Sequence, residues 1–148
     1  NISHDHLDYH KSFDNYINTK KIFFNNLEEG SIALVNKDDN KGEIMLQNSK
    51  ANKYSFSLKS FSDFKCKIIE SDFNGMLLNI DNHEVWVKLI GQFNAYNLLA
   101  IYGAADLLGL ETLNTLQLMS ELESVEGRFQ YLISKKKYNS NCRLCSYP

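Results

Sequence analysis

The chain has 148 residues, of which 43% are hydrophobic, and its 16 Lys and Arg side chains nearly balance 18 Asp and Glu side chains, giving a net charge of −2. This length fits one globular domain. The densest basic cluster is the lysine run 135–137, so the charge pattern argues against binding to a nucleic-acid backbone. The longest apolar stretch, 98–110, is too short to cross a bilayer, and the N-terminus lacks a secretory pattern. We therefore expect a soluble, intracellular protein.

The first third of the chain predicts a loop, a helix and a strand. Residues 1–10 are too rich in His and Asp for a buried strand, and a first residue Asn1 rather than Met suggests a start inside a longer protein. Apolar residues then recur at helical spacing, with Ser12 as a candidate cap and Gly30 as the stop. The short apolar run 31–35, bounded by turn residues, is typical of a buried strand in an α/β sheet.

The middle of the chain is typical of β-structure, and its last third of helices. Segments 53–58, 65–71, 75–80 and 84–89 alternate or carry β-forming residues between turn signals, which predicts short antiparallel strands and hairpins. The pattern turns helical after Gly91, with apolar positions from 98 to 108 and a stop at Gly109. A second helix is expected at 112–119 and a final strand at 129–133, so residues 1–133 are expected to form one mixed α/β unit.

Three histidines near the N-terminus form the densest group of side chains that could bind a metal. His4, His6 and His10 alternate with Asp5 and Asp8. From spacing alone a solvated polar turn is the favoured explanation, since neither a helical nor an extended spacing matches a zinc signature. The three cysteines are equally weak evidence, because the single C-x-x-C at 142–145 has no second pair.

Two asparagines and one arginine could contact a ligand. Asn94 and Asn97 precede the apolar helix, where Asn94 could simply be the N-cap, or both amides could hydrogen-bond a base. Arg128 could form a surface ion pair. It is, however, the only Arg among the first 142 residues, and its forked guanidinium suits a phosphate in a way that Lys cannot copy.

Several sequence blocks together resemble the Mur ligase family, and within it the UDP-N-acetylmuramoyl-tripeptide synthetases. They cover most of the chain in the family's order: D-H-L-D-Y-H at 5–10, Y-I-N-T-K at 16–20, A-L-V-N-K-D-D at 33–39, L-I-G-Q-F-N-A-Y-N-L-L-A at 89–100 and V-E-G-R-F at 125–129. One departure is His4, where close relatives usually carry Arg.

The resemblance implies part of the central, ATP-binding domain, an α/β fold with a mostly parallel sheet flanked by helices and a small antiparallel β subdomain. It implies an ATP- and magnesium-dependent ligase that activates the D-glutamyl carboxylate of UDP-N-acetylmuramoyl-L-alanyl-D-glutamate as an acyl phosphate, which a diamino acid attacks. By position, His6 matches a magnesium ligand and Lys20 the lysine that is carbamoylated to bind magnesium. Asn97, and less closely Asn94, match contacts to adenine in ATP, and Arg128 matches a contact to its phosphates.

The same resemblance implies elements that these 148 residues do not contain: the glycine-rich phosphate loop, the glutamate that completes the metal site and the C-terminal domain. We therefore expect no ATP-dependent ligation from this chain alone. The partners expected for the intact enzyme are the UDP-linked dipeptide and a diamino acid, with no nucleic acid and no membrane, and the enzyme is expected to be a cytoplasmic monomer.

The segment 135–148 is expected to be out of frame, with residues 1–134 forming the later part of the central domain. Codons permitted for 138–148, read one base later, encode Ile-Thr-Ala-Ile-Val-Asp-Tyr-Ala-His-Thr, which resembles the family's next motif. The shift falls beside the lysine run 135–137, which an AT-rich gene writes as poly-A. On this hypothesis the C-x-x-C arises by accident and holds no zinc.

Two other functions remain open from the sequence. One is another ligase of the same superfamily, such as a folylpolyglutamate or cyanophycin synthetase, which the D-H-L-D-Y-H block disfavours. The other is a small non-catalytic module that binds a metal or a nucleotide. A phosphate loop encoded upstream of Asn1 would distinguish a ligase from such a module.

Overall fold

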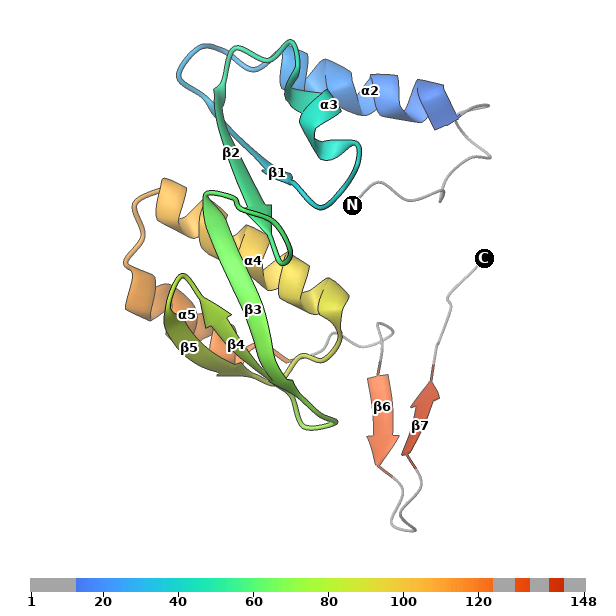
Figure 1. Ribbon diagram of the computed structural model, residues 1–148, viewed down its shortest axis with the longest axis vertical. Coiled ribbons are helices and arrows are strands. Elements are labelled where there is room, and N and C mark those ends of the chain that lie inside the picture. The colour runs from blue at the N-terminus through green and yellow to red at the C-terminus, as the bar shows by residue number, and fades with distance from the viewer. Residues whose placement is uncertain (1–12, 124–129, 134–138, 143–148) are drawn as a thin grey trace.

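The computed structural model describes residues 13–123, 130–133 and 139–142, and for residues 13–16 and those beyond 129 it describes the backbone alone. Four helices and seven strands lie in this part of the chain (Figure 1). The helices are α2 (Phe13–Asn25), α3 (Gly42–Leu46), α4 (Gln92–Leu107) and α5 (Thr112–Glu121). The strands are β1 (Ile32–Asn36), β2 (Asn52–Ser57), β3 (Phe64–Ser71), β4 (Met76–Ile80), β5 (His83–Val87), β6 (Gln130–Ile133) and β7 (Asn139–Cys142).

Strands β1 to β5 form a single mixed sheet in the order β1-β2-β3-β4-β5. β1 and β2 pair in parallel over their whole length, from Ile32 opposite Asn52 to Asn36 opposite Phe56. β2 and β3 are also parallel but share only two pairs, Phe56 with Phe64 and Ser57 with Lys65. β3, β4 and β5 are antiparallel. The expected α/β fold is confirmed, and the antiparallel strands extend the same sheet.

Most elements predicted from periodicity are present, and the differences have physical causes. The prediction of an antiparallel strand at 53–58 is wrong, because the crossover through α3 returns the chain to the start of β1 and makes β2 parallel. The five-residue helix α3 is too short to show a period. The helical pattern predicted after Gly91 is confirmed, since α4 begins at Gln92 and its C-cap is Leu108, directly before the expected stop at Gly109.

The parallel end of the sheet is covered on both faces. Alternate β1 residues point in opposite directions, so Ala33 and Val35 pack with Leu46 of α3 and with Phe24 of α2. Leu34 instead packs against the main core. β1 therefore lies between α2 with α3 on one side and α4 on the other.

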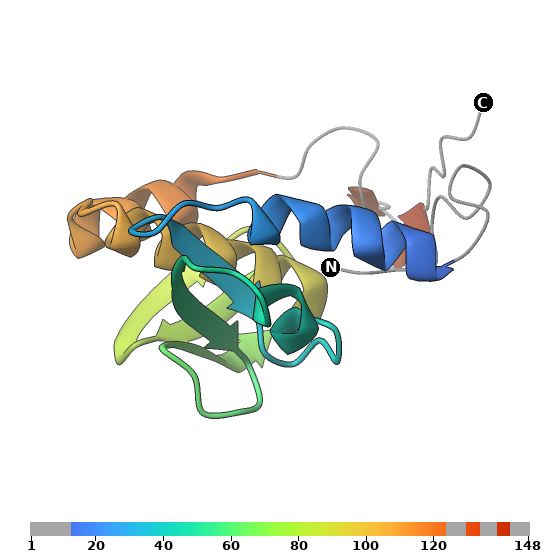
Figure 2. The same ribbon diagram turned by 90° about the horizontal axis from the view of Figure 1, so that it is seen from above.

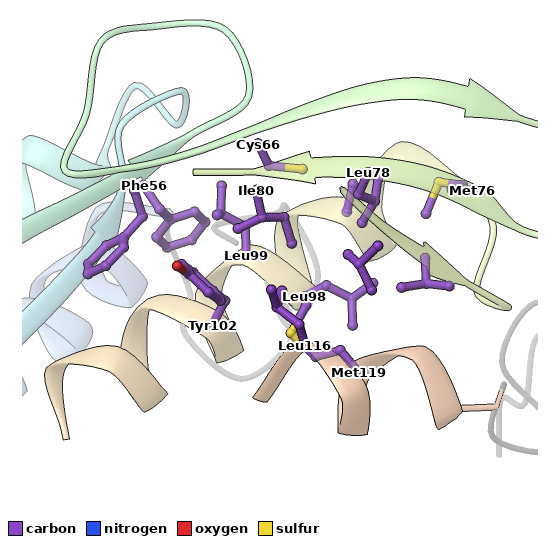
Figure 3. Packing of buried hydrophobic residues seen from close by; sticks show 14 residues of the cluster. Phe56, Cys66, Met76, Leu78, Ile80, Leu98, Leu99, Tyr102, Leu116 and Met119 are labelled. Carbon is purple, nitrogen blue, oxygen red and sulfur yellow. The ribbon is translucent and has the colours of Figure 1, made fainter. Parts of the chain in front are cut away.

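The main core lies between the antiparallel strands and helices α4 and α5. Figure 3 shows Leu98, Leu99 and Tyr102 of α4 and Leu116 and Met119 of α5 pointing toward the sheet. They meet alternate strand residues that are almost fully buried: Cys66, Met76, Leu78, Ile80 and Val87. Figure 2 shows both helices on one side of these strands, while the β2–β3 loop projects on the other side. None of the described helices is long and apolar enough to cross a bilayer.

β6 and β7 form a separate two-stranded antiparallel hairpin, with Gln130 opposite Cys142 and Ile133 opposite Asn139 (Figure 1). The expected final strand at 129–133 is therefore present. β7 lies within the segment expected to be out of frame. Backbone pairing requires no particular side chains, so the frameshift hypothesis stays a prediction.

Truncation of a core leucine tests this packing. Leu99 is 0% exposed, so Leu99→Ala removes packed atoms between α4 and the sheet and should lower the free energy of unfolding by about 2–5 kcal/mol. The matched control is Leu113→Ala on α5, where the side chain is 63% exposed and a change within about 0.5 kcal/mol is expected. Urea denaturation measures both, and equal losses would contradict the described core.

Candidate functional site

Polar residues gather where the two fully paired parallel strands end. Asn36 is the last residue of β1, with Asp38 and Asp39 two and three residues after it, and Ser57 is the last residue of β2. The carboxyl ends of parallel strands lie at one edge of a sheet, where open α/β folds bind their ligands. This edge is therefore the first place to look for function.

The carboxylate of Asp38 joins three segments at this edge. Its Oδ1 accepts a hydrogen bond from the Ser57 hydroxyl at 2.7 Å. Its Oδ2 accepts hydrogen bonds from the backbone N–H groups of Leu58 at 2.8 Å and Lys59 at 3.2 Å, and from the Tyr96 hydroxyl at 2.9 Å. The end of β1, the start of the β2–β3 loop and the first turns of α4 thus meet at one side chain.

The pKa values of Asp38 and Tyr96 are shifted in opposite directions in the folded chain. Burial alone would raise the pKa of Asp38, but hydrogen bonds from Ser57, Leu58 and Tyr96 outweigh it and hold the pKa below the ordinary value. Burial and the hydrogen bond to the Asp38 carboxylate raise the pKa of Tyr96 to about 12. At neutral pH the pair is therefore a carboxylate that accepts from a protonated phenol.

At the start of α4, Asn94 is not the N-cap that the sequence suggested. The N-cap is Gly91, with φ of 91° and no side-chain cap, so the interpretation of Asn94 as the N-cap is wrong. A residue at this φ is strained unless it is Gly, which explains why Gly91 occupies the position. The Asn94 side-chain amide donates to the Ile90 carbonyl at 2.8 Å, whereas Asn97 is exposed. Three residues apart, both asparagines lie on one face of the helix.

Lys20 lies on α2 and lines a cavity of about 210 Å³ at the same end of β1. Asn36 and Asp39 provide the polar lining, and the Asp39 Oδ1 atom also accepts from the Lys41 N–H at 2.9 Å. The apolar lining comes from α2, α3 and the strands: Phe24, Leu34, Val35, Met45 and Phe56. The neighbouring Lys21 bonds to Gln47 at 3.0 Å and does not line this cavity.

The donor set around Lys20 suits a hard cation once the amine is modified. Mg²⁺ prefers oxygen ligands, and Asn36 and Asp39 supply amide and carboxylate oxygens in the same cavity. An unmodified ammonium would repel the ion, whereas a carbamate on Lys20 would add anionic oxygens. Within the described residues, no group of three or more His, Cys, Asp or Glu side chains is arranged to hold a metal.

Three of the five predicted site residues lie in the described part of the chain. Lys20 and the turns that carry Asn94 and Asn97 all approach the carboxyl end of β1. His6 and Arg128, predicted to bind magnesium and the ATP phosphates, lie outside the described residues. Cys66 is buried in the core, where burial raises the pKa of its thiol to about 12, so it is not a nucleophile.

Sequence patterns do not single out the residues that organise this edge. Asp38, Ser57 and Tyr96 carry no predicted role, although Asp38 lies within the N-K-D-D segment that follows a predicted buried strand. A cluster of carboxamide and carboxylate side chains directly after such a strand is the signal that could have found Asp38. Nothing local indicates Ser57 or Tyr96.

The charge on Asp38 predicts how stability depends on pH. Since the pKa of Asp38 is lower in the folded chain, its contribution is present above the unfolded value of about 3.9 and is lost as pH falls through the folded value. Asp38→Asn should lower the free energy of unfolding by about 2 kcal/mol at pH 7. The difference from wild type should shrink toward pH 3. Thermal unfolding from pH 7 to pH 3 measures it, and a difference that stays constant would contradict the lowered pKa.

The sequence matches known proteins over most of its length. The family model of the Mur ligase middle domain matches residues 1–105. The chain is 52% identical over 140 residues to the UDP-N-acetylmuramoyl-L-alanyl-D-glutamate--2,6-diaminopimelate ligase of Phocaeicola vulgatus, and 48% identical over 134 residues to that of Cytophaga hutchinsonii. These alignments cover 95% and 90% of the chain but only 29% and 28% of the two relatives.

Solved structures share the fold at lower sequence identity. MurF from Acinetobacter baumannii matches with a TM-score of 0.83 and 18% identity, covering 97% of this chain and 32% of that one. MurF from Thermotoga maritima, solved in complex with ADP, matches with a TM-score of 0.73 and 21% identity, covering 91% and 32%. The resemblance noted in the sequence is thereby confirmed: the chain belongs to the Mur ligase family and forms part of its middle domain.

Proposed function

We propose that this chain forms part of the ATP-binding domain of a ligase that adds a diamino acid to UDP-N-acetylmuramoyl-L-alanyl-D-glutamate in peptidoglycan precursor synthesis. The names of the Phocaeicola and Cytophaga relatives support this substrate and favour 2,6-diaminopimelate as the diamino acid. The observation that carries the proposal is the convergence of Lys20 and the first turns of α4 on the carboxyl end of β1. The superfamily alternatives, folylpolyglutamate and cyanophycin synthetases, lack support from these names.

In the proposed reaction, the D-glutamyl carboxylate attacks the γ-phosphate of ATP, which forms an acyl phosphate and releases ADP. The amine of the diamino acid then attacks the acyl carbon, and phosphate leaves as the amide bond forms. When bound, magnesium would reduce the electrostatic repulsion between the two reacting anions, the D-glutamyl carboxylate and ATP. Lys20 as its carbamate and His6 would supply ligands to the ion. The neutral amide of Asn36 and the Asp39 carboxylate line the same cavity, and of these two the carboxylate adds negative charge.

The nucleotide would be held by side chains from α4 and from the segment after α5. Asn94 and Asn97 would hydrogen-bond the adenine, since an amide can donate and accept at the edge of one base. Arg128 would make a forked contact to phosphate. The Thermotoga MurF structure was solved in complex with ADP, which supports a nucleotide as ligand of this fold. The intact enzyme is proposed to act as a cytoplasmic monomer, apart from membranes and nucleic acids.

We also propose that residues 1–134 belong to the middle domain and that 135–148 are out of frame. Accurate resequencing of the source DNA across the lysine run 135–137 and upstream of Asn1 tests this directly. A corrected frame that encodes Val-Asp-Tyr-Ala-His-Thr-Pro, together with an upstream phosphate loop, is the expected result. An unchanged frame with stoichiometric zinc bound through Cys142 and Cys145 would contradict it.

A chimera tests the function, because the chain spans less than a third of its relatives. Residues 1–134 would replace the corresponding span of the Phocaeicola ligase, and the 148-residue chain alone should show no ligation. The chimera should ligate diaminopimelate, and Lys20→Ala should lower kcat by a factor on the order of 100 or more through loss of the metal-binding carbamate. Bicarbonate depletion should lower the activity of the unmutated chimera.

Lys21→Ala is the matched control, since Lys21 is the adjacent lysine on α2 and its ammonium contacts Gln47. This variant should retain activity within about twofold. A folded chimera without activity, or equal losses from both lysine variants, would contradict the proposal.

A further inference from the structure

The first turn of α4 has no side-chain N-cap, although the Asn94 amide donates to the Ile90 carbonyl just before it. Its N-cap, Gly91, offers no side chain to accept from the first amides, and no acidic residue lies in the first turn. The backbone N–H groups of Asn94 and Ala95 both bond to the Gly91 carbonyl. The direction and rotation of this turn must therefore be fixed by contacts with the rest of the molecule.

Tyr96 provides such a contact. Its hydroxyl donates to Asp38 Oδ2 at 2.9 Å across 58 residues of sequence. Asp38 is itself fixed to the sheet, because Ser57 at the end of β2 and the amides of Leu58 and Lys59 bond to the same carboxylate. The hydrogen bond from Tyr96 therefore connects α4 to a carboxylate that three other donors hold in place.

The position of Tyr96 within the turn connects this bond to the asparagines. At about 100° per residue, Asn94 and Asn97 point about 60° apart, and Tyr96 points about 100° from Asn97 and about 160° from Asn94. The tyrosine can therefore reach the sheet edge while Asn97 lies on the adjacent face of the helix and Asn94 on the nearly opposite face. A rotation of the helix that breaks the Tyr96 bond would displace both amides together.

We propose that Tyr96 is a positioning residue of the nucleotide site, whose hydrogen bond to Asp38 holds Asn94 and Asn97 in register with the carboxyl end of β1. The inference rests on the proposed contact of these asparagines with adenine. In this proposal Tyr96 acts through the two asparagines and not by contact with the nucleotide. It differs from a general stabilising residue because its loss should weaken nucleotide binding more than it slows the chemical step.

Hydrogen–deuterium exchange of the full 148-residue chain tests the tether without any nucleotide. Tyr96→Phe should speed exchange of the amides at 94–97 about fivefold relative to the rest of α4, since one hydrogen bond no longer restrains the turn. The matched control is Tyr54→Phe, which removes the hydroxyl of a half-buried tyrosine on β2. Asp38 instead accepts side-chain hydrogen bonds from Ser57 and Tyr96. Unchanged exchange in Tyr96→Phe, or equal changes in both variants, overturns the tether.

Kinetics of the chimera then test the link to the nucleotide. Tyr96→Phe should raise KM for ATP about fivefold while kcat stays within about twofold, and Tyr54→Phe should change neither. Faster exchange at 94–97 with an unchanged KM overturns the positioning role and, with it, the adenine contact of the asparagines. A loss confined to kcat overturns the proposal as well, because it would indicate a role in the chemical step. An inactive unmutated chimera counts against the proposed function, while the exchange measurement still decides the tether.

Discussion

The carboxylate of Asp38 is the interaction on which the edge of this sheet depends. Where parallel strands end, loops diverge and their backbone N–H groups need acceptors. One side chain satisfies the Leu58 and Lys59 amides and the Ser57 hydroxyl, and it bonds the Tyr96 hydroxyl as well. Burial would disfavour the charge, but these donors outweigh it. The same charge that orders the loop therefore orients a helix that begins more than fifty residues later.

The larger core and the polar residues of the candidate site lie at different ends of the mixed sheet. Its antiparallel end packs one face against α4 and α5, where Leu78 and Leu99 are fully buried, and this is the larger core. Its parallel end lies between helices on both faces, and its carboxyl edge carries the polar residues. α4 belongs to both parts: its middle packs on the antiparallel strands, while its first turns reach the parallel edge. Rigid packing of the helix can thereby support the geometry of the site.

The cavity at Lys20 combines a polar lining with apolar walls, and this combination bears on its proposed chemistry. Carbon dioxide reacts with an amine to form a carbamate, and the cavity beside Lys20 also contains apolar side chains such as Phe24 and Met45. The Asp39 carboxylate lines the same cavity, and a bound cation would favour the anionic carbamate proposed for Lys20. The lysine, the acid and the ion are therefore expected to act as a unit, which is why replacement of Lys20 should cost far more than replacement of Lys21.

Periodicity in the sequence determined β1, α2, α5 and the strands of the hairpins, because these patterns depend on residues within one or two turns of each other. The resemblance of the sequence blocks to a family drew attention to Lys20, and both that resemblance and the start of the apolar helix drew attention to Asn94 and Asn97. Only the tertiary structure decided that β2 runs parallel to β1, since strand direction follows from where the chain returns. It alone joined Asp38 to Tyr96, a hydrogen bond across 58 residues. Local patterns record which face of an element is buried, whereas contacts between distant polar groups depend on how the packed elements meet.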